Sequence, residues 1–100
     1  MSRHFDKDGQ VISFEQWAAY FEDVHYRSVA LDLVGYAEVS TIWNGTPSAA
    51  ETIFQQRPTL FETAVRGMPD FNVVARWYTL AEALEGHAEI VRRVRTHVSS

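Results

Sequence analysis

The chain has 100 residues, the length of one ordinary domain, and we expect residues 1–100 to form a single unit. Its formal net charge of -4 disfavours nonspecific attraction to nucleic acid or to an anionic membrane. The absence of cysteine excludes disulfides, thiolate nucleophiles and cysteine-based zinc sites. No apolar run approaches the roughly 20 residues of a membrane-spanning helix, and the polar N-terminus carries no secretion signal, so we expect a cytoplasmic protein.

A tight turn is predicted near the N-terminus, where Asp6, Asp8 and Gly9 lie between apolar residues. Glycine tolerates a positive φ and aspartate bonds to neighbouring backbone groups, so this segment favours a short hairpin. The same residues resemble the beginning of a calcium loop. The twelfth position counted from Asp6 is Trp17, however, where that loop needs glutamate. We therefore interpret the segment as a turn and predict no metal site.

The first helix is predicted over residues 14–23. Ser13 and Gln16 have the spacing of a capping box, in which each side chain bonds to the backbone N–H of the other residue. Trp17, Phe21 and Val24 recur at helical spacing and form its apolar stripe.

Two strands joined by a turn at Gly35 are predicted over residues 26–34 and 36–43. Apolar and polar residues alternate in both segments, which is the period of a strand with one buried face. The residues assigned to the buried face are Val29, Leu31, Leu33, Ala37, Val39, Thr41 and Trp43. Asp32 is assigned to the opposite face. The short link implies an antiparallel hairpin.

A connector from Asn44 to Pro58 follows, with a short helix expected over residues 48–56. A second hairpin is then predicted over residues 60–66 and 71–78, because both segments again alternate. Its expected buried residues are Phe61, Thr63, Val65, Phe71, Val73, Ala75 and Trp77.

The last helix begins at a second capping box, formed by Thr79 and Glu82. Its expected buried face has steps of three and four residues and comprises Leu80, Leu84, His87, Val91, Val94 and Val98. Three arginines near its C-terminal end complement the helix dipole, namely Arg92, Arg93 and Arg95.

These elements predict an α+β fold. Two hairpins form a four-stranded antiparallel sheet, and the N- and C-terminal helices pack on one of its faces. The other face is expected to mix polar and charged residues and to be solvated or to serve as a docking surface. Its expected members are Asp32, Glu38, Ser40, Glu62, Arg66, Arg76 and Tyr78.

Several stretches resemble a group of small uncharacterised proteins from actinobacteria and their phages. The matching stretches are Phe5-Asp6 with Gly9, 12–17, 21–23, 26–30, 39–43, 61–63, Tyr78-Thr79, 82–84 and Gly86-His87. The chain departs from this group between Thr46 and Arg57 and at Arg66-Gly67-Met68. The resemblance implies a phage or prophage context, and it transfers no catalytic residue because the group has no established activity.

No catalytic or cofactor-binding motif accompanies this pattern. The sequence holds no Gly-x-Ser-x-Gly, no glycine-rich phosphate loop and no His-Glu-x-x-His. His87 lies on the apolar face of the last helix, and we interpret it as a hydrogen-bonded residue at the edge of the core. The alternative is a pH-sensitive or ligand-contacting residue. The large aromatic residues lie on faces expected to be buried, which favours a core over a base-stacking platform.

Three functions are compatible with the sequence. The first hypothesis is a noncatalytic protein-interaction module that binds a second copy of itself or a host or phage protein through its outer sheet face or a strand edge. The second is an antitoxin-like or nucleic-acid-associated regulator, because the strand and helix over residues 77–84 resemble the sheet-plus-helix domain of HicB-like antitoxins. The third is a small enzyme with a site near His87, which would be built from that residue, Glu62 or Arg76.

We favour the first hypothesis, which needs no catalytic residue, cofactor or metal. The net charge disfavours nucleic acid as a partner, and no membrane contact is expected. The candidate interaction residues are Glu38, Glu62, Arg66, Arg76, Tyr78, His87, Arg92, Arg93 and Arg95.

Overall fold

A computed structural model describes residues 3–46, 58–68 and 73–99, and all structural statements below refer to these ranges. The elements in chain order are β1 (His4–Phe5), β2 (Val11–Ile12), α1 (Phe14–Glu22), α2 (Val24–Arg27), β3 (Ser28–Val34), β4 (Ala37–Trp43), β5 (Phe61–Arg66), β6 (Val73–Trp77) and α4 (Leu80–Ser99). The short helix expected over 48–56 and the side chain of Phe71 lie outside the described residues.

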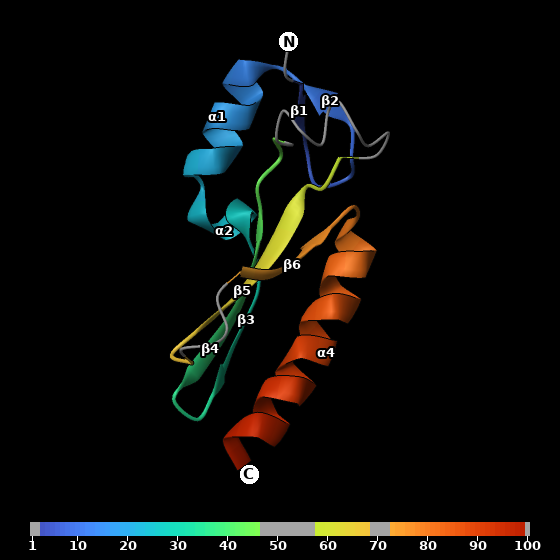
Figure 1. Cartoon of the computed structure of the whole chain (residues 1–100). Helices are drawn as coiled ribbons and strands as arrows, with labels where there is room; N and C mark the ends of the chain where they lie inside the picture. The colour runs from blue at the N-terminus through green and yellow to red at the C-terminus, as the bar shows by residue number, and fades with distance from the viewer. Residues whose placement is uncertain (1–2, 47–57, 69–72, 100) are drawn as a thin grey trace.

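The expected fold class is confirmed. Strands β3 to β6 form an antiparallel sheet in the order β3-β4-β5-β6, so β3 and β6 are its two edges. Figure 1 shows α4 running along one face of this sheet, while α1, α2 and the β1-β2 hairpin gather at the opposite end from the C-terminus. No helix in the described ranges is long and apolar enough to span a bilayer.

Capping explains where the N-terminal helices begin. Ser13 accepts a hydrogen bond from the backbone N–H of Gln16, and the Gln16 side chain accepts one from the backbone N–H of Ser13, as the capping box predicts. Asp23 then caps α2, because its carboxylate accepts from the backbone N–H groups of His25 and Tyr26. The predicted strand over 26–34 was therefore too long at its start, and β3 begins at Ser28.

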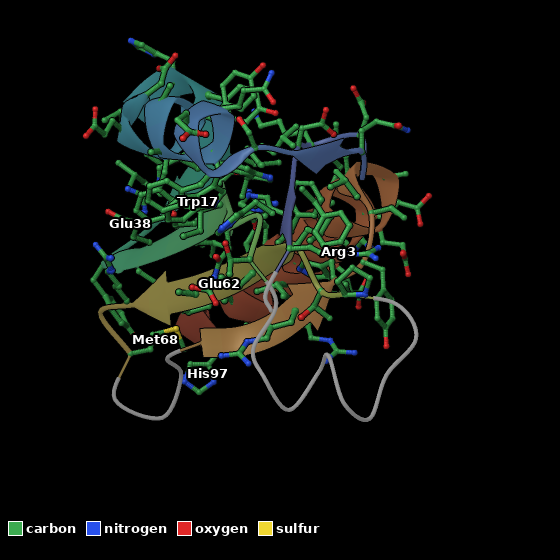
Figure 2. All side chains as sticks on the ribbon, turned by 90° about the horizontal axis from the view of Figure 1, so that it is seen from above. Arg3, Trp17, Glu38, Glu62, Met68 and His97 are labelled. Carbon is green, nitrogen blue, oxygen red and sulfur yellow. The ribbon has the colours of Figure 1, made fainter. Side chains whose placement is uncertain are left out.

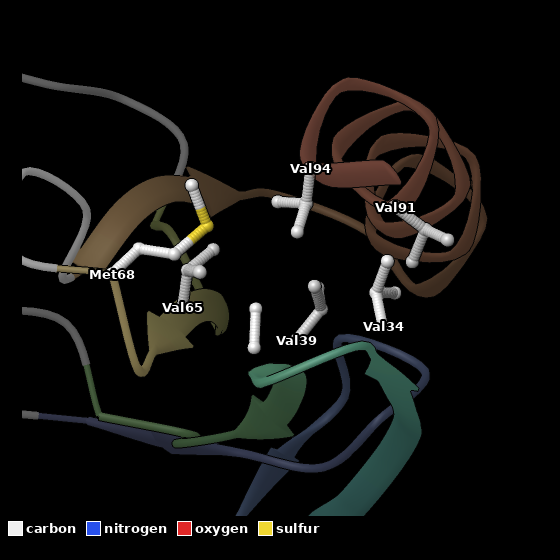
Figure 3. Packing of buried hydrophobic residues seen from close by; sticks show 7 residues of the cluster. Val34, Val39, Val65, Met68, Val91 and Val94 are labelled. Carbon is white, nitrogen blue, oxygen red and sulfur yellow. The ribbon is translucent and has the colours of Figure 1, made fainter. Parts of the chain in front are cut away.

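The inner faces of β4 and β5 match the predicted alternation. Every second residue of β4 and β5, from Ala37 to Trp43 and from Phe61 to Val65, is buried. One buried cluster lies under the C-terminal half of α4 and is seen in Figure 3; it comprises Val34, Ala37, Val39, Val65, Met68, Val91 and Val94. The second cluster lies nearer the N-terminal elements and comprises Trp43, Leu60, Phe61 and Ala83. Burial of these side chains supplies the main stabilisation of the fold.

The side chains at the end of β3 point to the opposite faces of the sheet from those predicted. Asp32 pairs with Val39 and Val34 pairs with Ala37, and residues opposite each other on antiparallel strands share a face. Asp32 and Val34 therefore face α4, whereas Leu31 and Leu33 face away and are 57% and 74% exposed. The cause is a β-bulge between Ser28 and Ala30. Val29 packs against the second cluster as expected, but the extra residue reverses the alternation after it.

Three further expectations need correction. Val24 was assigned to the apolar stripe of the first helix, but it begins α2 and is 71% exposed. Leu84 was assigned to the buried face of the last helix, but it is 46% exposed, because the buried row of α4 runs through Ala83, His87, Val91 and Val94. Tyr36 was assigned to a strand, yet it lies in the β3-β4 turn and is 66% exposed.

Hydrogen bonds from indole and backbone N–H groups hold the N-terminal elements against the end of the sheet. Trp43 Nε1 donates to the Phe5 carbonyl at 3.1 Å, and Trp17 Nε1 donates to the Asn44 carbonyl at 2.9 Å. The Phe5 N–H donates to the Gly45 carbonyl at 2.8 Å. Figure 2 shows the Trp17 side chain on the side of α1 that faces the sheet. Trp43 is fully buried and Trp17 is partly buried, and each indole N–H group has an acceptor.

Gly86 allows α4 to approach β6 closely. A Cβ atom at this position would lie 2.2 Å from Cη2 and Cζ2 of Trp77, which is far inside van der Waals contact. The glycine therefore costs helix propensity in the middle of α4 but leaves room for the indole ring.

Replacing Gly86 tests this close approach. We expect Gly86→Ala to lower the free energy of unfolding by about 1–3 kcal/mol, because the added methyl group overpacks the contact with Trp77. Urea denaturation followed by circular dichroism measures the change. The neighbouring exposed substitution Glu85→Ala serves as control and should stay within about 0.5 kcal/mol. A gain of about 1 kcal/mol for Gly86→Ala, as helix propensity alone predicts, would contradict the packing account.

Candidate functional site

A chain of polar side chains crosses the interior between α4 and the sheet. Asp32 Oδ2 lies 2.7 Å from His87 Nε2, and His87 Nδ1 lies 2.7 Å from Thr41 Oγ1. Thr41 Oγ1 lies 2.5 Å from Thr63 Oγ1, and Trp77 Nε1 donates to Thr63 Oγ1 at 2.9 Å. The chain thus joins all four strands of the sheet to α4.

Local structure explains how these five residues meet. Thr41 and Thr63 are direct cross-strand partners on the inner faces of β4 and β5. The bulge in β3 turns Asp32 to the same face, and His87 belongs to the buried row of α4. His87 is only 4% exposed and both threonines are fully buried, whereas the Asp32 side chain is half exposed at the edge of the sheet.

The hydrogen bonds in this series all run in one direction, with each group donating to the next from Trp77 to Asp32. An indole N–H can only donate, so Thr63 accepts from Trp77 and gives its own proton to Thr41. Thr41 then donates to His87 Nδ1, and the remaining ring N–H at Nε2 donates to the Asp32 carboxylate. Every polar hydrogen in the chain has an acceptor when the proton of the neutral imidazole is on Nε2. A proton on Nδ1 would instead reverse the threonines and leave the buried Thr63 hydroxyl hydrogen without an acceptor within the chain, at a cost of about 1–3 kcal/mol.

This series of hydrogen-bonded side chains contains the three groups of a hydrolytic triad, namely a carboxylate, an imidazole and a hydroxyl. A nucleophile must also reach its substrate, and the Thr41 hydroxyl is fully buried beneath α4 between His87 and Thr63. The geometry therefore supports a structural role, in which the chain satisfies buried polar groups and aligns α4 with the sheet. This agrees with the interpretation of His87 as a hydrogen-bonded residue of the core.

The outer sheet face carries four of the predicted interaction residues. Arg66 lies 3.7 Å from Glu38, and Arg76 lies 3.7 Å from Glu62, in two cross-strand ion pairs. Figure 2 shows Glu38 on β4 and Glu62 on β5. Between these two rows lie the small residues Ser40 and Ala64, which are opposite each other. The acidic and basic charges on this face are thus matched.

Sequence reasoning missed the two leucines of this face. Leu31 and Leu33 form a stripe along its β3 edge, beside Ser40 and Glu38 of β4. We call this pair the leucine stripe. Asp32, which was expected here, faces α4, and Tyr78 lies in the bend after β6. A polar group among apolar residues at Asp32, with two threonines and a histidine also assigned to buried faces, was the signal that could have revealed the interior network.

The arginines of α4 do not join the outer face. Arg92 and Arg93 lie three and four residues after Glu89 on the same helical surface, and both contact its carboxylate. Arg95 is exposed. The hydrogen bond from Arg92, followed by its positive charge, lowers the pKa of Glu89 below its ordinary value. Among the described residues, no group of three histidine, aspartate or glutamate side chains could hold a metal ion.

Comparisons with protein-family models, with curated proteins and with solved structures give no match to this chain.

Determining which ring nitrogen of His87 carries the proton tests the direction of the interior hydrogen bonds. We expect its neutral ring to carry the proton on Nε2, because only this form satisfies both threonine hydroxyls. Long-range ¹H–¹⁵N spectra of histidine-labelled protein distinguish the two ring nitrogens. The exposed His25 provides a reference in the same spectrum. A proton on Nδ1 of neutral His87 would show that the chain does not run from Trp77 to Asp32.

Proposed function

We propose that this protein is a noncatalytic interaction module that associates with a second copy of itself through the outer face of its sheet. The leucine stripe is the observation that carries this proposal. Leu31 and Leu33 point outward from the edge strand β3 and are 57% and 74% exposed, so they leave apolar surface in contact with water. Complete burial of a leucine side chain is worth about 1.5–3 kcal/mol relative to exposure, and a symmetric contact uses each leucine twice.

The face of the sheet suits this contact better than the free edge of β3. A bulge interrupts the edge between Ser28 and Ala30, and the charged Asp32 points inward from it. Both features hinder the addition of another strand. If two copies of β3 paired about Asp32, two carboxylates would also stand opposite each other, which is unfavourable.

Charge balance favours a second copy as the occupant. The chain carries a net charge of -4, but the outer face holds two glutamates and two arginines in cross-strand pairs. The excess negative charge therefore lies elsewhere on the molecule. Two such faces can approach each other without net repulsion, and the small residues Ser40 and Ala64 offer a shallow surface for leucine side chains from the partner.

The competing hypotheses have less support. A nucleic-acid regulator would use the arginines near the end of α4, but Arg92 and Arg93 are engaged by Glu89, which weakens their use as a phosphate-binding cluster. An enzyme site near His87 would need its residues to meet at an accessible surface, but His87 is only 4% exposed on the inner side of the sheet, whereas Glu62 and Arg76 pair with each other on the outer face. We further propose the cytoplasm of a bacterial host as the location and a phage or prophage as the source, which rest on composition and on the resemblance described above.

Self-association can be measured by light scattering across a dilution series. We expect the apparent mass to rise with concentration from the monomer value of 11.4 kDa toward twice that value. Leu33→Lys should keep the protein monomeric, because it places a charge at the centre of the apolar contact.

Leu84→Lys is the matched control. It makes the same substitution at an exposed leucine of α4, on the other side of the sheet, and should leave association unchanged. Circular dichroism confirms that both variants fold. A constant monomer mass for the wild-type protein at all concentrations, or equal effects of the two substitutions, would refute the proposal.

A further inference from the structure

A groove of about 620 Å³ lies between α4 and the edge strand β6, away from the leucine stripe. Ala75 and Trp77 of β6 line one wall, and Ile90 and Val94 of α4 line the other. Acidic side chains follow the helix rim, with Glu82 and Glu85 at the end nearer the start of α4. Arg92 and Arg93 line the far end, where both contact Glu89. The groove is thus apolar at its centre and oppositely charged at its ends.

Two local features build this groove. Thr63 pairs with Ala75 and Ala64 pairs with Val73, so Val74 is an extra residue that makes a bulge in β6. The bulge lets the consecutive residues Val74 and Ala75 both line the groove, whereas a regular strand would point them to opposite faces. At the other end, Gly86 admits the Trp77 ring, and the hydrogen bond from Trp77 Nε1 to Thr63 fixes its orientation. The walls are therefore preformed.

We propose that this groove binds an extended peptide segment that carries an apolar side chain followed or preceded by a lysine or arginine. Length supports a peptide, because α4 from Glu82 to Val94 extends for about 18 Å. This matches five or six residues of extended chain at about 3.3 Å each. The bulge prevents a long regular strand from pairing with β6, so recognition relies on side chains that enter the groove.

Charge selects a basic side chain at one end. Glu82 is engaged by Thr79 in the capping box, and Glu89 by Arg92 and Arg93. Glu85 lines the groove on the exposed surface of α4, one turn before Glu89. With three glutamates and two arginines along the groove, the lining has a net negative charge, and a lysine or arginine beside Glu85 complements it.

The test uses a random heptapeptide library displayed on phage and selected on the immobilised full chain. We expect enriched peptides to combine an apolar residue with a lysine or arginine. The synthetic form of an enriched peptide should shift the NMR signals of the Trp77 indole and the backbone amides of Ala75 and Glu85. Glu85→Lys should weaken its binding about tenfold.

Glu22→Lys supplies the matched control, because it makes the same charge change at an exposed glutamate of α1. It should leave the dissociation constant within about twofold of the wild-type value. Binding to the Leu33→Lys variant should be equally strong, which separates this site from the self-association surface.

Failure to enrich any shared sequence, or equal binding by the wild-type protein and Glu85→Lys, would overturn the proposal. So would loss of self-association in Glu85→Lys, since the groove would then be covered by a second copy of the chain.

Discussion

The hydrogen bond between His87 Nε2 and Asp32 ties α4 to an edge strand of the sheet at 2.7 Å. It gives a partner to the ring N–H of His87, which is only 4% exposed, and it holds the half-exposed Asp32 carboxylate on the α4 side of β3. Because side chains alternate along a strand, holding Asp32 on the inner face also holds Leu31 and Leu33 on the outer face. One contact on the inner face is thereby linked to the apolar character of the outer face of the same strand.

The interior chain extends this constraint across the domain. Thr41, Thr63 and Trp77 continue it from His87 to the opposite edge, so each strand contributes one member. Trp77 in turn packs against Gly86 and forms one wall of the groove beside α4. The position of α4 is therefore defined at both edges of the sheet, and the two proposed contact surfaces lie on opposite sides of that common framework. An adaptor that joins a copy of itself to a short peptide would use both surfaces.

Much of this fold follows from local sequence patterns, and the exceptions have identifiable physical causes. Alternation predicted the inner faces of β4 and β5, and capping boxes at Ser13 and Thr79 predicted the starts of two helices. Alternation failed in β3 because a bulge is a tertiary feature that no local period reveals. The charged residues of the outer face were predicted from the same period. The leucine stripe, the Asp32–His87 contact and the groove were not, because each depends on how separate elements meet.

The side chains of Leu31 and Leu33 point outward from β3 and those of Asp32 and Val34 point toward α4, and the proposed self-association surface depends on this orientation. Thiol labelling of two single-cysteine variants, Leu33→Cys and Val34→Cys, tests it most directly, since the chain has no other cysteine. In dilute protein, we expect rapid labelling at position 33, where the native residue is 74% exposed, and strong protection at position 34, where it is 6% exposed. Equal rates, or faster labelling at position 34, would show that Leu33 does not point outward and would remove the basis for the proposed self-association surface.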